Sequence, residues 1–164
     1  MIIDNFNLNE RSIRLDTTQG NPIENAQTLE ISEFEKNQFN AFDKWCENAT
    51  IRSTPTPTYN CHGMTFASRR TGIFSSAELK KILLEDGYVK IQLEQVLPGD
   101  VIIYYSEDRD FEHSGIIISA PDQILKIPKV MSKWGKFAEM LHWANNCPYT
   151  FSNTEYYRIK QTNG

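Results

Sequence analysis

The order of the predicted elements is the feature that constrains the fold of this chain most. Helical patterns come first, and continuous apolar runs at residues 101–105 and 113–118, typical of central strands, follow them. Tight turns at 98–100 and 120–122 bound these strands, and residues 123–130 can return as the next one. Helices followed by neighbouring strands on short connections are typical of an α+β domain with a mostly antiparallel sheet.

Four further segments complete the predicted element list. Ser32 and Glu35 form a capping box ahead of an amphipathic helix that carries its aromatic stripe at positions 39 and 42. A second box at Ser75 and Glu78 begins a helix that stops at Gly87. Apolar positions between 134 and 144 suit one face of a short helix. Residues 88–93 are predicted to form a half-exposed strand, and residues 156–159 are predicted to form an edge strand.

Composition limits the classes of partner. The chain has 164 residues, which suits a single domain over 31–164 preceded by a polar segment over 1–30. Its net charge of -4 gives no reason to expect a nucleic acid or an anionic membrane as partner. The chain has no apolar run of membrane-spanning length and no secretory signal pattern, and its three cysteines form no complete disulfide set. We therefore expect a cytoplasmic protein, although a specialised secretion route would leave no such mark.

Cys61 stands where a stiff segment turns into a helix. The prolines within residues 54–58 hold the approach extended, and Asn60 is suited to cap a helix with Cys61 in its first turn. The positive end of a helix lowers the pKa of a thiol, which favours a reactive cysteine. Gly63 lets another backbone or a substrate come close. The alternative is that Cys61 is a small buried hydrophobe.

A thiol nucleophile needs a base, and the chain has three histidines. His62 adjoins Cys61 on the helix, so its side chain points about 100° away from the thiol. His113 begins an apolar strand, where a polar side chain has no packing reason to be, and Gly115 leaves the same face open. For His142, within the predicted helix, a structural role is favoured. His113 is therefore the candidate base, with a surface histidine as the alternative.

Three blocks together resemble the papain-like cysteine peptidases and amidases, most closely the NlpC-type and CHAP-type enzymes. They are Asn60-Cys61-His62-Gly63 opening a helix, Leu97-Pro98-Gly99-Asp100-Val101-Ile102 entering a strand, and His113-Ser114-Gly115-Ile116 starting the next strand. Their order and spacing agree with that family across residues 55–130, roughly half of the chain. The resemblance implies a papain-like fold in which N-terminal helices pack against the sheet.

The resemblance also implies roles. Cys61 would be the nucleophile and His113 the general base and later the acid, with the Cys61 N–H and the side chain of Tyr59 or Asn60 holding the oxyanion. The expected substrate is a peptide or another amide, including a cell-wall peptide, and no cofactor or metal is expected. Asp100, in its Pro-Gly-Asp turn, is expected to be a structural cap.

The residue that orients His113 departs from the family pattern. NlpC-type enzymes carry a polar residue, often His, Asn or Gln, on the strand after the histidine, and residues 123–132 contain no His or Asn. Ser132 is the first choice for this role, followed by Gln123 and Asp122. Trp134 either lines a substrate groove or holds the last helix on the sheet.

Three alternatives to a thiol hydrolase stay open. An acyltransferase would use the same site, because hydrolysis and transfer differ in the access of water. A catalytically inactive binding domain of the same fold would keep Cys61 and His113 without turnover. A metal site of Cys61, His62, His113 and His142 is disfavoured, because no pair has the spacing of common metal motifs.

Overall fold

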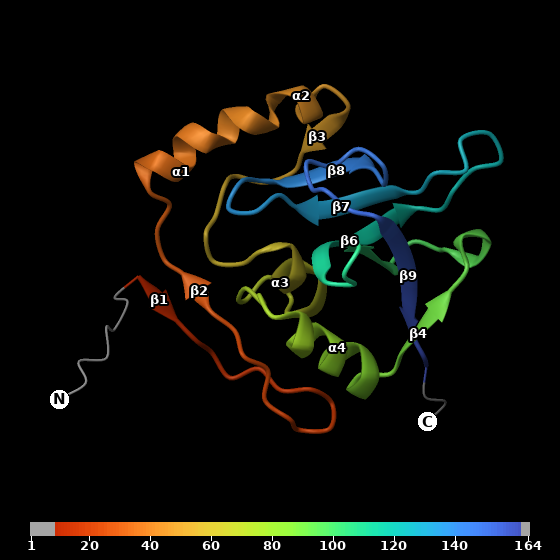
Figure 1. The fold of residues 1–164 in the computed structure, drawn as a ribbon, viewed down its shortest axis with the longest axis horizontal. Helices are drawn as coiled ribbons and strands as arrows, with labels where there is room; N and C mark the ends of the chain where they lie inside the picture. The colour runs from red at the N-terminus through yellow and green to blue at the C-terminus, as the bar shows by residue number, and fades with distance from the viewer. Residues whose placement is uncertain (1–8, 162–164) are drawn as a thin grey trace.

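The computed structural model describes residues 9–161, and these form an α+β fold around a seven-stranded sheet (Figure 1). The strands lie in the order β3-β8-β7-β6-β5-β9-β4, and every pairing among the described residues is antiparallel. Their bounds are β3 (Ala49–Ile51), β4 (Tyr88–Ile91), β5 (Val101–Tyr105), β6 (Phe111–Ser119), β7 (Lys129–Lys133), β8 (Glu139–Trp143) and β9 (Asn153–Ile159). The expected α+β class with a mostly antiparallel sheet is confirmed.

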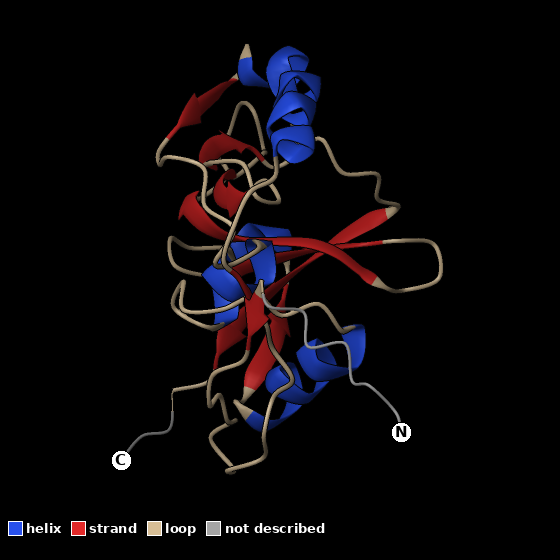
Figure 2. Cartoon of the chain, turned by 90° about the vertical axis from the view of Figure 1, so that its left-hand side faces the viewer, coloured by secondary structure: helices blue, strands red, loops and turns tan. Residues whose placement is uncertain are grey.

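The helices lie in the first 95 residues. They are α1 (Glu33–Gln38), the 3₁₀ helix η1 (Phe39–Phe42), α2 (Asp43–Cys46), α3 (Cys61–Phe66), α4 (Ser76–Glu85) and the 3₁₀ helix η2 (Leu93–Gln95). Seen from the side, α1 and α4 lie at opposite ends of the sheet (Figure 2). No helix within residues 9–161 has the length and apolarity to cross a membrane.

One of the two predicted capping boxes is present. At α1, Ser32 accepts from the Glu35 N–H and the Glu35 carboxylate accepts from the Ser32 N–H. At α4, Ser75 is the N-cap residue but forms no side-chain cap, so the second box is wrong. The Glu78 carboxylate instead accepts from the Glu24 N–H and from Lys81, because the N-terminal segment lies against this helix.

The two faces of the sheet carry different cores, as alternation along a strand requires. On β5, Val101 and Ile103 face one core cluster, which also contains Leu79 of α4. Ile102 and Tyr104 face the second cluster, which the segment after β8 completes with Ala144 and Cys147. Consecutive residues of β6 and β7 therefore point to opposite faces of the sheet. Candidate site residues on these strands can contact one another only where they share a face.

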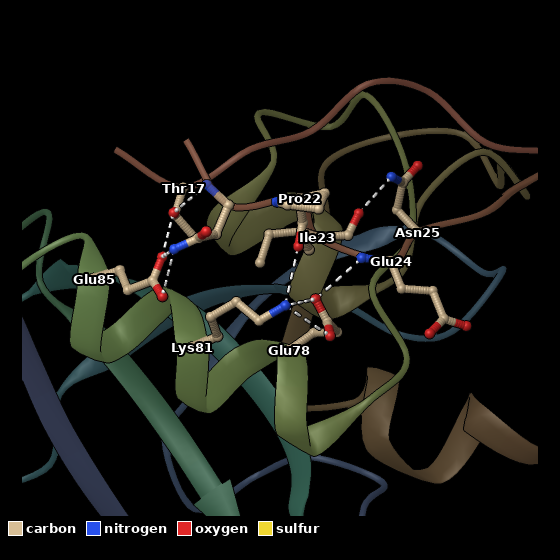
Figure 3. A network of polar contacts seen from close by, with 9 residues as sticks. Thr17, Pro22, Ile23, Glu24, Asn25, Glu78, Lys81 and Glu85 are labelled. Carbon is tan, nitrogen blue, oxygen red and sulfur yellow. Dashed lines mark hydrogen bonds and ion pairs between the residues drawn. The ribbon is translucent and has the colours of Figure 1, made fainter. Parts of the chain in front are cut away.

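The N-terminal segment is held along α4 by polar contacts (Figures 1 and 3). The Glu85 carboxylate accepts from Thr17 and Asn21, and Lys81 donates to the Pro22 carbonyl. Ile23 is buried in the same core cluster as α4. The segment contains two short paired strands, β1 (Glu10–Arg11) and β2 (Gln27–Thr28). Residues 10–28 thus pack on the sheet-bearing part of the chain.

The strand predicted over 123–130 is wrong. Residues 123–125 form a turn in which the Asp122 carboxylate accepts from the Ile124 and Leu125 N–H groups, and β7 begins only at Lys129. Pro128, which has no N–H to donate, precedes the strand instead of lying within it. The shift places Ser132 inside β7.

The helix predicted over 134–144 is also wrong. Gly135 has a left-handed φ of 58°, and the Trp134 N–H donates to the Ala138 carbonyl, which closes a hairpin into β8. The helical spacing of apolar residues was misleading because Trp134 packs in the turn and only the residues from 139 onward belong to an extended strand. The predicted edge strand at 156–159 lies in β9, which is paired on both sides, between β5 and β4.

Candidate active site

Cys61 is the first residue of α3, and Asn60 caps this helix. The Asn60 carboxamide oxygen accepts from the Gly63 N–H at 2.9 Å and from the Ile73 N–H at 3.1 Å, and its amide donates to the Ile73 carbonyl at 2.7 Å. These bonds occupy the Asn60 oxygen and one of its two amide N–H groups. The thiol itself is enclosed, with Cys61 only 6% exposed.

Gly63 allows α3 to lie against the Thr71 backbone. A Cβ at this position would lie 1.8 Å from the Thr71 carbonyl oxygen and 3.1 Å from the Tyr59 Cβ. The backbone approach expected from the sequence is therefore present. It fixes the start of α3, and hence Cys61, against its surroundings.

His113 lies within β6, fully buried, and is joined to two other strands by a line of hydrogen bonds. Its Nε2 is 2.8 Å from the Ser132 Oγ of β7, and that oxygen is 2.7 Å from the His142 Nε2 of β8. The His142 Nδ1 is 2.8 Å from the Trp143 carbonyl oxygen. The structure thus brings His113 together with Ser132, the first choice for the orienting residue. The other two candidates, Gln123 and Asp122, lie in the turn before β7.

The chemistry of this line fixes where each proton resides. A carbonyl only accepts, so the His142 Nδ1 donates to Trp143 and the His142 Nε2 accepts from the single Ser132 hydroxyl proton. The Ser132 oxygen then accepts from the His113 Nε2–H. The His113 Nδ1 therefore carries a lone pair, and this buried nitrogen has no hydrogen-bond partner among the described residues.

Helix α3 meets the same strand at Ser114, the residue directly after His113. His62 and Thr65 of α3 meet the Ser114 hydroxyl, at 2.8 Å from the His62 Nδ1 and 3.1 Å from the Thr65 Oγ1. The Ser114 N–H lies toward the Cys61 thiol and lowers its pKa. The sulfur therefore lies at the main chain just beyond His113, although no thiol–imidazole hydrogen bond is formed.

Burial keeps both groups neutral at pH 7. It raises the pKa of the Cys61 thiol to about 11. The backbone N–H groups of Ser114, His62 and Cys61 and the charge of Lys133 lower this pKa, but their effect is smaller than that of burial. Burial also holds the pKa of His113 well below its ordinary value, helped by the positive charges that His142 and His62 would carry. The resting pair is thus a thiol and a neutral imidazole.

Tyr149 covers the His113 ring. The two rings are stacked, with centroids 4.0 Å apart and planes inclined by 15°, and Tyr104 lies 5.3 Å from the same imidazole. These rings and the hydrogen bond to Ser132 fix the orientation of the imidazole. The strand alternation of β5 could have indicated Tyr104, but nothing in the sequence pattern pointed to Tyr149.

Of the two aromatic candidates, Tyr59 lies at a cavity, whereas Trp134 lies in the core. The Tyr59 hydroxyl donates to Glu139 at 2.6 Å. Trp134 is fully buried against Met140 and Ala138, so the groove-lining alternative is wrong and it serves as a core residue. Its indole N–H has no hydrogen-bond partner among the described residues.

A cavity of about 340 Å³ opens beside the start of α3. Its walls come from the approach to Cys61, from the turn at Gly135 and from the N-terminal segment. The lining residues are Glu10, Ala26, Thr28, Pro57, Tyr59, Asn60, Phe74, Gly135 and Lys136. Cys61 itself does not line the cavity, which reaches as far as its neighbour Asn60.

The structure decides the expectations for Asp100 and His142. The Asp100 carboxylate accepts from the Leu97 N–H at 2.8 Å and pairs with Arg158, so it is the structural cap expected. His142, assigned to a helix, instead lies on β8 in the line that ends on His113. Within residues 9–161, no three His, Cys, Asp or Glu side chains are grouped as a metal ion would require.

A scan against family models and searches of curated proteins and of solved structures gave no significant match.

Proposed function

We propose that this protein is a thiol-dependent amide hydrolase, a peptidase or amidase of papain-like arrangement, with Cys61 as nucleophile and His113 as base. The observation that carries the proposal is the unpartnered His113 Nδ1. A buried nitrogen that lacks a partner costs free energy, about 1–3 kcal/mol, and such groups concentrate at functional sites. The line through Ser132 and His142 leaves the lone pair on this nitrogen, on the strand that also meets the thiol.

The proposed reaction is a covalent two-step hydrolysis. The Cys61 sulfur attacks the amide carbonyl carbon while its proton passes to the His113 Nδ1, and the Cys61 N–H donates to the developing oxyanion. The imidazolium then gives that proton to the leaving amine, and a thioester on Cys61 remains. A water molecule, deprotonated by His113, attacks the thioester and releases the acid and the free thiol.

Ser132 and His142 would act by holding the base. The Ser132 oxygen accepts from the His113 Nε2–H in both protonation states, and the imidazolium strengthens that bond because its donor is then charged. This is the part that a third polar residue plays in papain-like enzymes, and here a serine supported by a histidine would fill it. Tyr149, stacked on the ring, would keep it from rotating.

A thiol-reactive amide probe, such as a peptidyl chloromethyl ketone, tests the proposal. Peptide mapping by mass spectrometry should find the adduct on Cys61, and His113→Ala should abolish this labelling while the protein stays folded. Equal labelling of Cys46 and Cys147 would remove the case for a tuned nucleophile. Product analysis with an added amine separates hydrolysis from acyl transfer.

A non-catalytic binding domain is the second candidate, and the enclosure of Cys61 favours it. The thiol is 6% exposed and the His113 ring is fully buried. Amide substrates that bind without turnover, with the same affinity for the wild-type chain and for Cys61→Ser, would favour this candidate. Turnover that Cys61→Ser removes while binding persists would favour the hydrolase.

A further inference from the structure

Lys133 is a fully buried lysine at the end of β7, and no role was expected for it from the sequence. It follows Ser132 directly, so strand alternation points it to the opposite face, toward α3. Its ammonium donates to the Thr56 carbonyl at 2.8 Å and to the Gly135 carbonyl at 2.7 Å. These two acceptors belong to the segments that form two walls of the cavity beside Cys61.

The charge of this ammonium is not neutralised by a salt bridge to any described carboxylate. Its partner in the β7–β8 register is Glu139, but both carboxylate oxygens of Glu139 are held by Arg69, and one of them also by the Tyr59 hydroxyl. The Glu139 charge raises the pKa of Lys133 from a distance, but the direct partners of the ammonium are two neutral carbonyls. A buried cation without a direct ion pair is costly, and proteins normally pair it.

After Glu139, the thiol of Cys61 is the second ionisable group on which this charge acts. The ammonium lowers the pKa of the Cys61 thiol, and the thiolate in turn favours the charged lysine. The Nζ also lies 5.2 Å from the centroid of the Tyr59 ring, two residues before Cys61. Both relations place the ammonium on the side of the site that carries the thiol.

We propose that Lys133 is a positioning residue for the Cys61 site: its ammonium is the counter-charge of the thiolate, and its two hydrogen bonds tie together the walls of the cavity. The role of Lys133 in turnover rests on the proposed function, whereas its effect on the thiol does not. A cation fixed here would stabilise the negative sulfur that forms when the thioester is released.

Other charged and titratable groups also surround the thiol, so a test has to separate Lys133 from them. They are His62 of α3, His113 of β6, Tyr149 after β8, and the group of Tyr59, Arg69 and Glu139 beyond Lys133. Burial lowers the pKa of Lys133 to about 8, so it is charged at pH 7 and neutral above pH 9. If the effect on the reactivity of Cys61 is lost between pH 7 and pH 9, Lys133 is its source.

The experiment compares the rate of Cys61 alkylation by iodoacetamide in the wild-type chain and in Lys133→Met, read at the single site by mass spectrometry. At pH 7 the variant should react at least about tenfold more slowly, because the thiolate has lost its counter-charge. The difference should shrink as the pH rises past 8. Lys129→Met, on the same strand, makes the same charge change and should react at the wild-type rate.

A second pair of measurements separates charge from structure. Negatively charged iodoacetate should lose more rate than neutral iodoacetamide in Lys133→Met, since a purely structural change would slow both alike. If that variant does not fold, the pH profile of the wild-type chain replaces it: the rate of Cys61 alkylation should rise by less than about tenfold per pH unit between pH 7 and pH 9, because the lysine loses its charge there. A rise of about tenfold per pH unit throughout, or a folded variant that alkylates at the wild-type rate, would overturn the proposal. Absence of amide turnover would instead count against the hydrolase alone.

Discussion

His113 shows how much one residue can tell about a site when its two ring nitrogens have different environments. The Nε2 donates into a line of three groups that ends on the Trp143 carbonyl, whereas the Nδ1 has no partner. A core histidine kept only for structure usually has both nitrogens satisfied, because an unpaired buried polar atom is destabilising, although the buried N–H of the core residue Trp134 is also unpartnered among the described residues. The asymmetry is what a general base requires.

Replacing Ser132 should separate the base from its support. Ser132→Ala removes the link between His113 and His142 and leaves two buried ring nitrogens unpaired, so we expect turnover to fall by about 10–100-fold and the free energy of unfolding by about 1–3 kcal/mol. Steady-state kinetics and urea titration measure the two effects. Ser119→Ala, at the exposed end of β6, should change neither quantity. Unaltered turnover in Ser132→Ala would contradict the orienting role.

The pH dependence of turnover should reflect the depressed pKa of His113. A base is active while unprotonated, so a pKa held well below 6.5 leaves His113 competent through neutral pH and places the acid limb of kcat/KM below pH 6.5. The profile should be measured with circular dichroism at each pH to confirm the fold. An acid limb centred at pH 6.5 or above would contradict the burial of the ring.

At the residue scale, the sequence predicted Cys61, His113 and Ser132 but not the groups around them. The first two stand out because a cysteine at a helix start and a histidine in an apolar strand break the local pattern. Lys133 was missed and His142 was assigned to a helix, because the direction in which each side chain points depends on strands that were placed wrongly. A correct start for β7 would have assigned Ser132 and Lys133 to opposite faces.

At the scale of elements, α3 is the part that the local sequence specifies best. Asn60 supplies the cap, the prolines hold the approach extended, and Gly63 allows contact with Thr71. The segment 134–144 is the opposite case. Its apolar spacing suits a helix, but a hairpin lets Trp134 and Met140 pack with Phe42 and Trp45, so tertiary packing overrides the local pattern.

Gly63→Ala should disrupt the position of α3. Its new methyl group would overlap the Thr71 carbonyl, which is backbone and cannot move aside cheaply. We expect the free energy of unfolding to fall by about 3 kcal/mol or more, together with loss of Cys61 labelling. Lys80→Ala, on the surface of α4, should stay within about 0.5 kcal/mol in the same denaturant titration. A Gly63→Ala chain of wild-type stability would show that this contact is not required.

The N-terminal segment should loosen when its anchor on α4 is removed. Glu85→Ala deletes the acceptor for Thr17 and Asn21, so limited proteolysis within residues 10–28 should become faster while the sheet stays protected. Glu94→Ala, on η2, removes a carboxylate of the same type elsewhere and serves as the control. Equal cleavage rates in the two variants would mean that the remaining contacts, those of Ile23, Lys81 and Glu78, are enough to hold the segment.

At the scale of the whole molecule, the three histidines couple stability to pH. Burial lowers the pKa of His62 and of His142 to about 4 and holds that of His113 well below its ordinary value, whereas in the unfolded chain histidine titrates at about pH 6.5. Above this pH all are neutral in both states. Below it, the unfolded chain binds protons that the folded chain excludes, so the folded state loses stability as the pH falls.

Urea titrations between pH 8 and pH 4 measure this effect. The free energy of unfolding should be nearly constant above pH 7 and should then fall by up to about 1.4 kcal/mol per pH unit for each of the three protons. A stability that stays level or rises between pH 6.5 and pH 4.5 would mean that the imidazoles are not buried as neutral groups.

The most direct test of the central claim is the tautomeric state of His113, measured by ¹⁵N NMR of the histidine side chains at pH 7. The hydrogen-bond line predicts a neutral ring with its proton on Nε2 and a lone pair on Nδ1, while His142 carries its proton on Nδ1. A His113 ring with a proton on Nδ1, in either the neutral or the charged form, would leave the thiol of Cys61 without a base and would contradict the account.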